Sequence, residues 1–246
     1  MVGRRGWDHR ADRRPRRQRR RLGPVLRRRL RLRHRNAERT PIAGGVSGSI
    51  AVVGAPFDDD LGTESGAAYV FDLGTGELLH KLLPSDGRQN TYFGGAIAVS
   101  GNLAVIGTYP DTTTGGAYVF DLTTGQELHR LESSDQSPFG VGLSVALDGS
   151  IAVIDGAFGA NVFDATTGEQ LATLAVPADL RSAPAASTRI AVSGGDVLIG
   201  FPDVEDSDEN EVGTVYLYTA QIPVDRQPEG LIIERGGAAS FELALV

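Results

Sequence analysis

Two stretches of the 246-residue chain concentrate carboxylate side chains that could bind a cation. Carboxylate oxygens are ligands that Ca²⁺ prefers in proteins, so the spacing of these acids decides whether they could form a site. The first stretch contributes Asp58, Asp60 and Glu64, and the second contributes Asp203, Glu205, Glu209 and Glu211. The second stretch lacks the glycine that lets a calcium loop fold back on its ion. We therefore expect weak calcium binding, on the order of millimolar, and no firm metal site.

Histidine and cysteine, which supply many catalytic groups, give no enzyme-like pattern. The chain has no cysteine, which excludes thiol nucleophiles and cysteine-bound zinc. His80 and His129 occupy the same place in a repeated segment, and a third copy of that segment has Ala172 there. This tolerance predicts strand packing rather than catalysis. His9 and His34 lie among arginines, so no Ser–His–Asp arrangement is indicated, and we expect neither an enzyme nor a cofactor.

A segment of the sequence recurs along the chain, which indicates a repeat architecture. The segment YVFDLGTGELLHKL begins at Tyr69 and returns as YVFDLTTGQELHRL at Tyr118, 49 positions later. Alignment of the chain on itself gives four copies, which begin at Val46, Tyr92, Pro138 and Ser187. Such a period predicts one supersecondary unit per copy, with the core formed between neighbouring units.

Each copy predicts four short antiparallel strands. In the second copy, strands at 97–99 and 103–106 are joined by Ser100-Gly101-Asn102, where the glycine supplies a positive φ. An aromatic strand follows a polar loop, and an Asp-x-x-Thr-Gly turn leads into the fourth strand. The acids that open these turns are interpreted as turn caps; they are Asp72, Asp121 and Asp164. Four such strands in about forty residues are the unit of a β-propeller blade.

The same segments resemble FG-GAP repeats, found in integrin alpha propellers and in bacterial surface proteins. Phe93-Gly94 and Phe139-Gly140 match the FG element, and Gly54-Ala55-Pro56 matches GAP, within about residues 46–220. The resemblance implies an all-β partial propeller of about four four-stranded blades. It also implies non-enzymatic recognition or adhesion, extracellular or at the cell surface, with an unidentified protein or glycan ligand. The family's calcium loop is reduced here to short turns such as Ser100-Gly101-Asn102, so its calcium site is not implied.

The acids of each copy fall mainly in the loop after the second strand. Equivalent loops of a repeat lie on one rim, so we expect a strongly negative rim, which serves either solubility or binding.

Two other functions stay open. The Asp-x-x-Thr-Gly segment also resembles quinone-dehydrogenase propeller repeats, which carry a tryptophan soon afterwards, whereas the only tryptophan here is Trp7. The chain could still be the propeller fragment of a larger hydrolase or oxidoreductase. Nucleic-acid binding through an arginine-rich opening is the other alternative, although we do not expect nucleic acid to be the main partner.

The opening of the chain differs in charge from the rest. Residues 1–40 hold seventeen Arg and three acids, a net charge of +14, whereas residues 41–246 carry −21. No apolar stretch in the opening is long enough for a signal peptide or a membrane span. We expect residues 1–44 to be a disordered arm or a non-native lead-in, with a targeting segment as a further alternative.

The predicted domains follow from these boundaries. The predicted propeller repeats cover residues 45–221. We expect the first and last blades to be incomplete because the repeat begins in the middle of a hairpin. Residues 222–246 end in alternating Phe241, Leu243 and Leu245, which indicate a half-buried strand. This truncated β segment resembles the start of an immunoglobulin-like domain, with a propeller-closing strand as the alternative.

Overall fold

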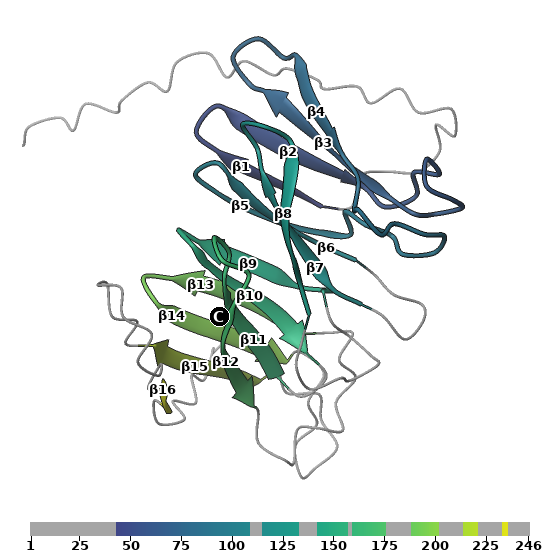
Figure 1. Cartoon of the computed structure of the whole chain (residues 1–246). Coiled ribbons are helices and arrows are strands. Elements are labelled where there is room, and N and C mark those ends of the chain that lie inside the picture. Colours follow the sequence, from purple (N-terminus) through teal and green to yellow (C-terminus); the bar gives the residue numbers. More distant parts are fainter. Residues whose placement is uncertain are drawn as a thin grey trace, which may run out of the picture. The chain divides into compact units, whose positions relative to one another are not determined.

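The computed structural model describes residues 43–108, 115–132, 142–156, 159–175, 188–201, 214–220 and 233–235 (Figure 1). All of them belong to one compact unit, Leu32–Val246. They form four antiparallel sheets of four strands each, which confirms the predicted all-β fold of four blades. Among the described residues no helix is long and apolar enough to cross a membrane.

The four sheets repeat one order, in which each strand pairs with its neighbours in sequence. The first sheet contains β1 (Gly44–Ser47), β2 (Ile50–Ala55), β3 (Ala67–Asp72) and β4 (Leu78–Leu82). The second contains β5 (Ala96–Ser100), β6 (Leu103–Gly107), β7 (Ala117–Asp121) and β8 (Gln126–Leu131). The third contains β9 (Val145–Asp148), β10 (Ile151–Gly156), β11 (Gly159–Asp164) and β12 (Gln170–Ala175). The fourth contains β13 (Arg189–Ser193), β14 (Asp196–Phe201), β15 (Thr214–Ala220) and β16 (Ile233–Arg235).

Two predicted turns recur at one end of the sheets. The hairpin between β5 and β6 turns at Gly101, whose φ of 58° falls in the left-handed region. In the turn between β7 and β8, the Thr123 N–H donates to Oδ1 of Asp121 at 2.7 Å, and Gly125 has a φ of 74°. The Thr166 N–H makes the same bond to Asp164, and in the first sheet the N–H of Thr75, one residue further along the turn, donates to Asp72. The hairpin glycine and the turn-capping aspartates are therefore confirmed.

The first and last sheets are complete, which corrects the expectation that both would be incomplete. In the first sheet Gly44–Ser47 pairs with β2. Because glycine has a low strand propensity, the sequence pattern indicates a strand only from Val46 onward. A Cβ on Gly45 would lie 2.6 Å from Cγ2 of Val99, so this glycine lets β1 lie close to β5. In the fourth sheet Ile233–Arg235 pairs with β15, so these three residues belong to the propeller. Phe241, Leu243 and Leu245 lie outside the described residues.

Adjacent sheets pack against each other through three clusters of buried apolar side chains. The largest side chains of the first junction are Leu82, Phe93, Ile106, Tyr118, Phe120 and Leu122. Those of the second are Val105, Leu131, Ile154 and Phe163, and those of the third are Leu174, Ile199, Phe201 and Tyr218. The second strand of a middle sheet is buried on both faces, as predicted, because Ala104, Val105 and Ile106 have no exposed surface.

A backbone contact between glycines fixes the first two junctions. A Cβ on Gly54 would lie 2.0 Å from the carbonyl oxygen of Gly94, and one on Gly107 would lie 2.0 Å from that of Gly142. Gly94 and Gly142 have φ of 91° and 92°, which side chains rarely adopt. Gly142 therefore stands in the third sheet where Gly94 stands in the second. The sequence pattern predicts Phe139-Gly140 for that position. Those two residues lie outside the described ones.

Candidate functional site

The loops that follow the second strands lie at the end of the sheets opposite the turns. We call this end the loop rim; its described loops include 56–66, between β2 and β3, and 83–95, between β4 and β5. Asp58, Asp60 and Glu64 lie in the first of these loops. The other predicted acids, Asp203, Glu205, Glu209 and Glu211, lie outside the described residues.

Asp58 is buried and contacts a phenol and an ammonium group. The Tyr69 hydroxyl donates to its Oδ2 at 2.7 Å, and Nζ of Lys81 lies 3.0 Å from the same oxygen. Lys81 also bonds Asp60 and lies 5.2 Å from the centroid of the Tyr69 ring. Burial lowers the pKa of Lys81, but the hydrogen bonds to Asp60 and Asp58 outweigh it and raise the pKa above its ordinary value. The only lysine of the chain thus offsets one of the four negative charges of this loop.

Glu64 points to a different neighbour. Its backbone has a φ of 55°, and its N–H donates to Oδ1 of Asp59 at 2.8 Å. The Tyr92 hydroxyl, from the connection to the second sheet, donates to Oε2 of Glu64 at 2.7 Å. The three described candidates therefore do not converge on one point. Within the part of the chain that the structure describes, no group of three or more histidines and acids is placed to hold a metal ion.

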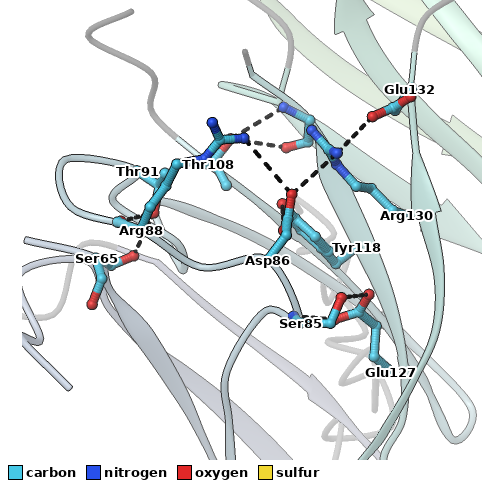
Figure 2. A network of polar contacts seen from close by, with 11 residues as sticks. Ser65, Ser85, Asp86, Arg88, Thr91, Thr108, Tyr118, Glu127, Arg130 and Glu132 are labelled. Carbon is cyan, nitrogen blue, oxygen red and sulfur yellow. Dashed lines mark hydrogen bonds and ion pairs between the residues drawn. The ribbon is translucent and has the colours of Figure 1, made fainter. Parts of the chain in front are cut away.

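A second charged cluster lies at the next sheet, where Asp86 sits between two arginines (Figure 2). The Arg130 Nη1 lies 3.1 Å from Asp86 Oδ2, and the Arg88 Nη2 lies 3.9 Å from the same oxygen. The Tyr118 hydroxyl donates to Asp86 Oδ1 at 2.7 Å, and burial, followed by this bond, raises the pKa of Tyr118. Arg130 also pairs with Glu132 at 2.7 Å. Because Tyr118 and Arg130 occupy the places of Tyr69 and Lys81, the cluster repeats the first with another acid.

Loop 83–95 is fixed to both sheets that it connects. The Ser85 N–H and hydroxyl donate to the carboxylate of Glu127 on β8, at 2.8 and 2.9 Å (Figure 2). The Thr91 hydroxyl donates to the carbonyl oxygen of Ser65 in the first sheet's loop at 2.9 Å. The loop therefore bridges the first junction.

The third sheet fills the same place with neutral groups. Asn161 stands at the position of Tyr118, and Thr173 at that of Arg130. The Thr173 hydroxyl donates to Oδ1 of buried Asn161 at 3.1 Å, and Nε2 of Gln170 donates to the same oxygen at 2.9 Å. The polar cluster is kept, but its charge is not.

Cations also gather at the loop rim, which the loop sequences did not indicate. The Lys and Arg side chains that the structure describes all lie there; they are Lys81, Arg88, Arg130 and Arg189. They come from the connection after the fourth strand and from strand ends rather than from the acidic loops. In its described part the loop rim thus carries both signs of charge, and ion pairs offset part of the expected negative charge.

The two repeated histidines lie at the turn end of the sheets. Their Nε2 atoms face main-chain carbonyl oxygens of the next sheet, His80 that of Thr123 at 3.3 Å and His129 that of Thr166 at 2.9 Å. The prediction that they pack in strands is confirmed, because they lie in β4 and β8. A pocket of about 320 Å³ beside the first is lined by Ile50, Leu79, His80, Gly101, Asn102, Leu122 and Thr123.

The place of Asp155 after an apolar second strand predicts one of the acids of the negative rim, but the structure buries it. It stands in β10 at the position of Gly54 and Gly107, and its side chain is fully buried. The Gly142 N–H donates to Oδ1 at 2.7 Å, while Oδ2 is buried without a hydrogen-bond partner. Burial raises the pKa of Asp155 to about 7, against the lowering effect of the backbone N–H groups.

Comparisons with known proteins find a repeat family similar to part of the chain and a solved structure with a similar fold. A family model described as FG-GAP repeat matches residues 45–71 and 78–120. The crystal structure of the computationally designed Ika4 protein is 23% identical, with a TM-score of 0.51 over 79% of this chain and 99% of that chain. At this identity the likeness concerns the fold alone. No curated protein matches the sequence significantly.

Proposed function

We propose that this chain, which carries FG-GAP repeats at residues 45–71 and 78–120, is a non-enzymatic recognition scaffold that binds a protein or glycan outside the cell. FG-GAP repeats are typical of extracellular proteins, which supports the location. The four-sheet repeat fold is the scaffold, and the loop rim is the surface that we assign to the ligand.

The anchoring of the rim loops carries this proposal. Asp58 with Lys81, and Asp86 with Arg130, fix the bases of loops 56–66 and 83–95. Exposed side chains between these anchors, such as that of Thr63, are therefore presented on loops that are already ordered. A preordered surface lowers the entropy cost of binding a partner. The mixed charge of the rim favours a partner with hydroxyl, carboxylate and amine groups, as glycans and protein surfaces have.

The histidines support a non-enzymatic role. His80 and His129 both face main-chain carbonyl oxygens, so neither presents its Nε2 to a nucleophile. Asp155, whose pKa is raised, is buried beneath the rim and accepts a main-chain N–H.

Calcium binding at this rim is proposed to be weak and diffuse. Lys81 already pairs with Asp58 and Asp60, and a divalent ion would have to displace it. We expect dissociation constants on the order of millimolar. Titration calorimetry with CaCl₂ tests this, and a stoichiometric micromolar isotherm that persists in about 0.5 M salt would contradict it.

The recognition proposal is tested by binding of the purified chain to a glycan array and to immobilised extracellular matrix proteins. Thr63→Arg and Gln89→Arg change exposed residues of the two rim loops, whereas Ser49→Arg changes an exposed residue at the turn end. We expect the rim variants to weaken binding about tenfold or more, which corresponds to about 1.4 kcal/mol, and the control to leave it unchanged. Equal loss in all three variants, or turnover in hydrolase and oxidoreductase assays, would refute the proposal.

A further inference from the structure

In each sheet, three positions form the face that packs against the following sheet. They lie on the second and third strands, and the strand register places them side by side. In the first three sheets these positions hold valine, valine and alanine: Val52, Val70 and Ala68; Val105, Val119 and Ala117; Val153, Val162 and Ala160. Each of these nine side chains is at most 2% exposed, because the next sheet covers it.

Within the described part of the chain, the fourth sheet has the same face, but its side chains are exposed. Leu198 pairs with Leu217 as Val105 pairs with Val119, and Val215 stands at the third position. These larger apolar residues are 43%, 44% and 57% exposed. Exposed apolar residues gathered on one sheet face are typical of an interaction surface.

The close backbone contact that glycines make in the first two junctions has no counterpart among the described residues of the fourth sheet. Gly200 stands at the position of Gly54 and Gly107. A Cβ on either of those would lie 2.0 Å from a carbonyl oxygen of the following sheet. A Cβ on Gly200 would meet nothing nearer than the Arg189 carbonyl oxygen at 3.8 Å, which belongs to its own sheet. The described part of the fourth sheet thus has room for another sheet.

The opposite face of the first sheet is partly open. Leu73 is 38% exposed, whereas the residues at its position in the next two sheets, Leu122 and Ala165, are 2% and 0% exposed. Val46 is 64% exposed, although its equivalent Val99 packs against the first cluster. Leu73 and Val46 therefore lie open on the first sheet, whereas Ala51 and Phe71 on the same face are 5% and 7% exposed.

We propose that the fourth sheet of one copy of this chain receives the first sheet of a second copy. One chain exposes apolar side chains on both faces that such a junction needs, and the junction would continue the interface already used three times within the chain. Burial of the exposed leucines and valines supplies the driving force. The contact is head-to-tail, so it either closes into a ring or grows into a filament. Two copies that close would combine eight sheets, within the range of about four to eight blades in propellers.

Size-exclusion chromatography with light scattering on the full chain tests this. We expect a dimer mass that falls toward the monomer on dilution. Leu217→Glu, on the fourth sheet, and Leu73→Glu, on the first, should each raise the dissociation constant at least about tenfold. The matched control is Leu128→Glu, whose leucine on β8 is equally exposed at 40% and lies on neither face; it should leave the dimer intact.

Mixing the two variants distinguishes a head-to-tail contact from a symmetric one. The Leu217→Glu chain keeps a wild-type first sheet, and the Leu73→Glu chain keeps a wild-type fourth sheet, so an equimolar mixture should form a dimer through one intact junction. A symmetric contact of two fourth sheets would leave the Leu73→Glu variant dimeric. That result, or a wild-type chain that stays monomeric at every concentration, would overturn the proposal.

Folding of the variants is followed by circular dichroism in the same samples. Because Leu217 is largely exposed, its replacement should leave the strand spectrum unchanged at dilutions where the wild type is monomeric. A lower melting temperature under those conditions would mean that residues of the same chain cover this face, which would also overturn the proposal.

Discussion

The Nε2 atom of His129 lies 2.9 Å from the carbonyl oxygen of Thr166, across the junction between the second and third sheets. The imidazole ring lies over Gly168, where a Cβ would be 2.8 Å from its Cγ atom. The third sheet has Ala172 at the histidine position, and the sequence after β15 has no Asp-x-x-Thr-Gly turn. A histidine is therefore present where the next sheet has the Asp-x-x-Thr-Gly turn and absent where the next sheet lacks it.

Replacing His129 should weaken the second junction. We expect His129→Ala to lower the free energy of unfolding by about 1 kcal/mol through loss of the hydrogen bond, and His80→Ala, with a longer bond, to lower it less. Urea denaturation measures both. Ala172→His is the control and should give no gain, because the turn motif that would face it is missing from the sequence; a gain equal to the His129 loss would contradict this account.

The two Tyr–cation–acid clusters should differ in strength because their acids differ in burial. The Asp58 side chain is fully buried, whereas that of Asp86 is 34% exposed. Asp58→Ala leaves Lys81 and Tyr69 without a buried partner and should lower the free energy of unfolding by about 3 kcal/mol. Asp86→Ala should lower it by about 1 kcal/mol at most, because solvent screens that pair. Denaturation curves that show equal losses would contradict the role of burial.

Asp155 should make stability depend on pH. Burial raises its pKa to about 7 in the folded chain, above the value of 3.8 taken for an unperturbed carboxyl. The folded state therefore binds the proton more tightly, so the contribution is full below about pH 4 and is lost as pH rises through about 7. Asp155→Asn removes the titration and should flatten stability between about pH 5 and 8, with a gain over wild type of roughly 2 kcal/mol at the upper end. Parallel urea-denaturation curves across this range would contradict the prediction.

The glycine contact predicts opposite outcomes for two equivalent positions. Gly107→Ala places a methyl group against the Gly142 carbonyl oxygen, which cannot yield as a side chain would, and should cost more than about 2 kcal/mol. Gly200→Ala meets open space and should change stability by less than about 0.5 kcal/mol. Thermal melts at a concentration where the chain is monomeric compare the two, and equal losses would argue against the contact.

Features set by neighbouring residues could be predicted from the sequence, and contacts between distant segments could not. The hairpin at Gly101 and the turn cap of Asp121 depend on local text, so both were found. The first charged cluster takes its acid from its own sheet, whereas the second takes Asp86 from the connecting loop, so no constant spacing marks the pair with Arg130. The position of Asp155 in the repeat predicts a rim acid, and only the packing of the sheets shows that it is buried.

Tyr69, Tyr118 and Asn161 stand at the same position of three successive sheets, so the molecule itself compares different residues at one site. Two sheets fill the surrounding site with a phenol, a cation and an acid, and the third fills it with an amide, a hydroxyl and a second amide. All three solutions stand on the same pair of strands in the same register. Repeated copies within one chain can thus exchange ionic for neutral chemistry without altering the backbone. The site requires hydrogen bonding of its members, and the electric charge is interchangeable.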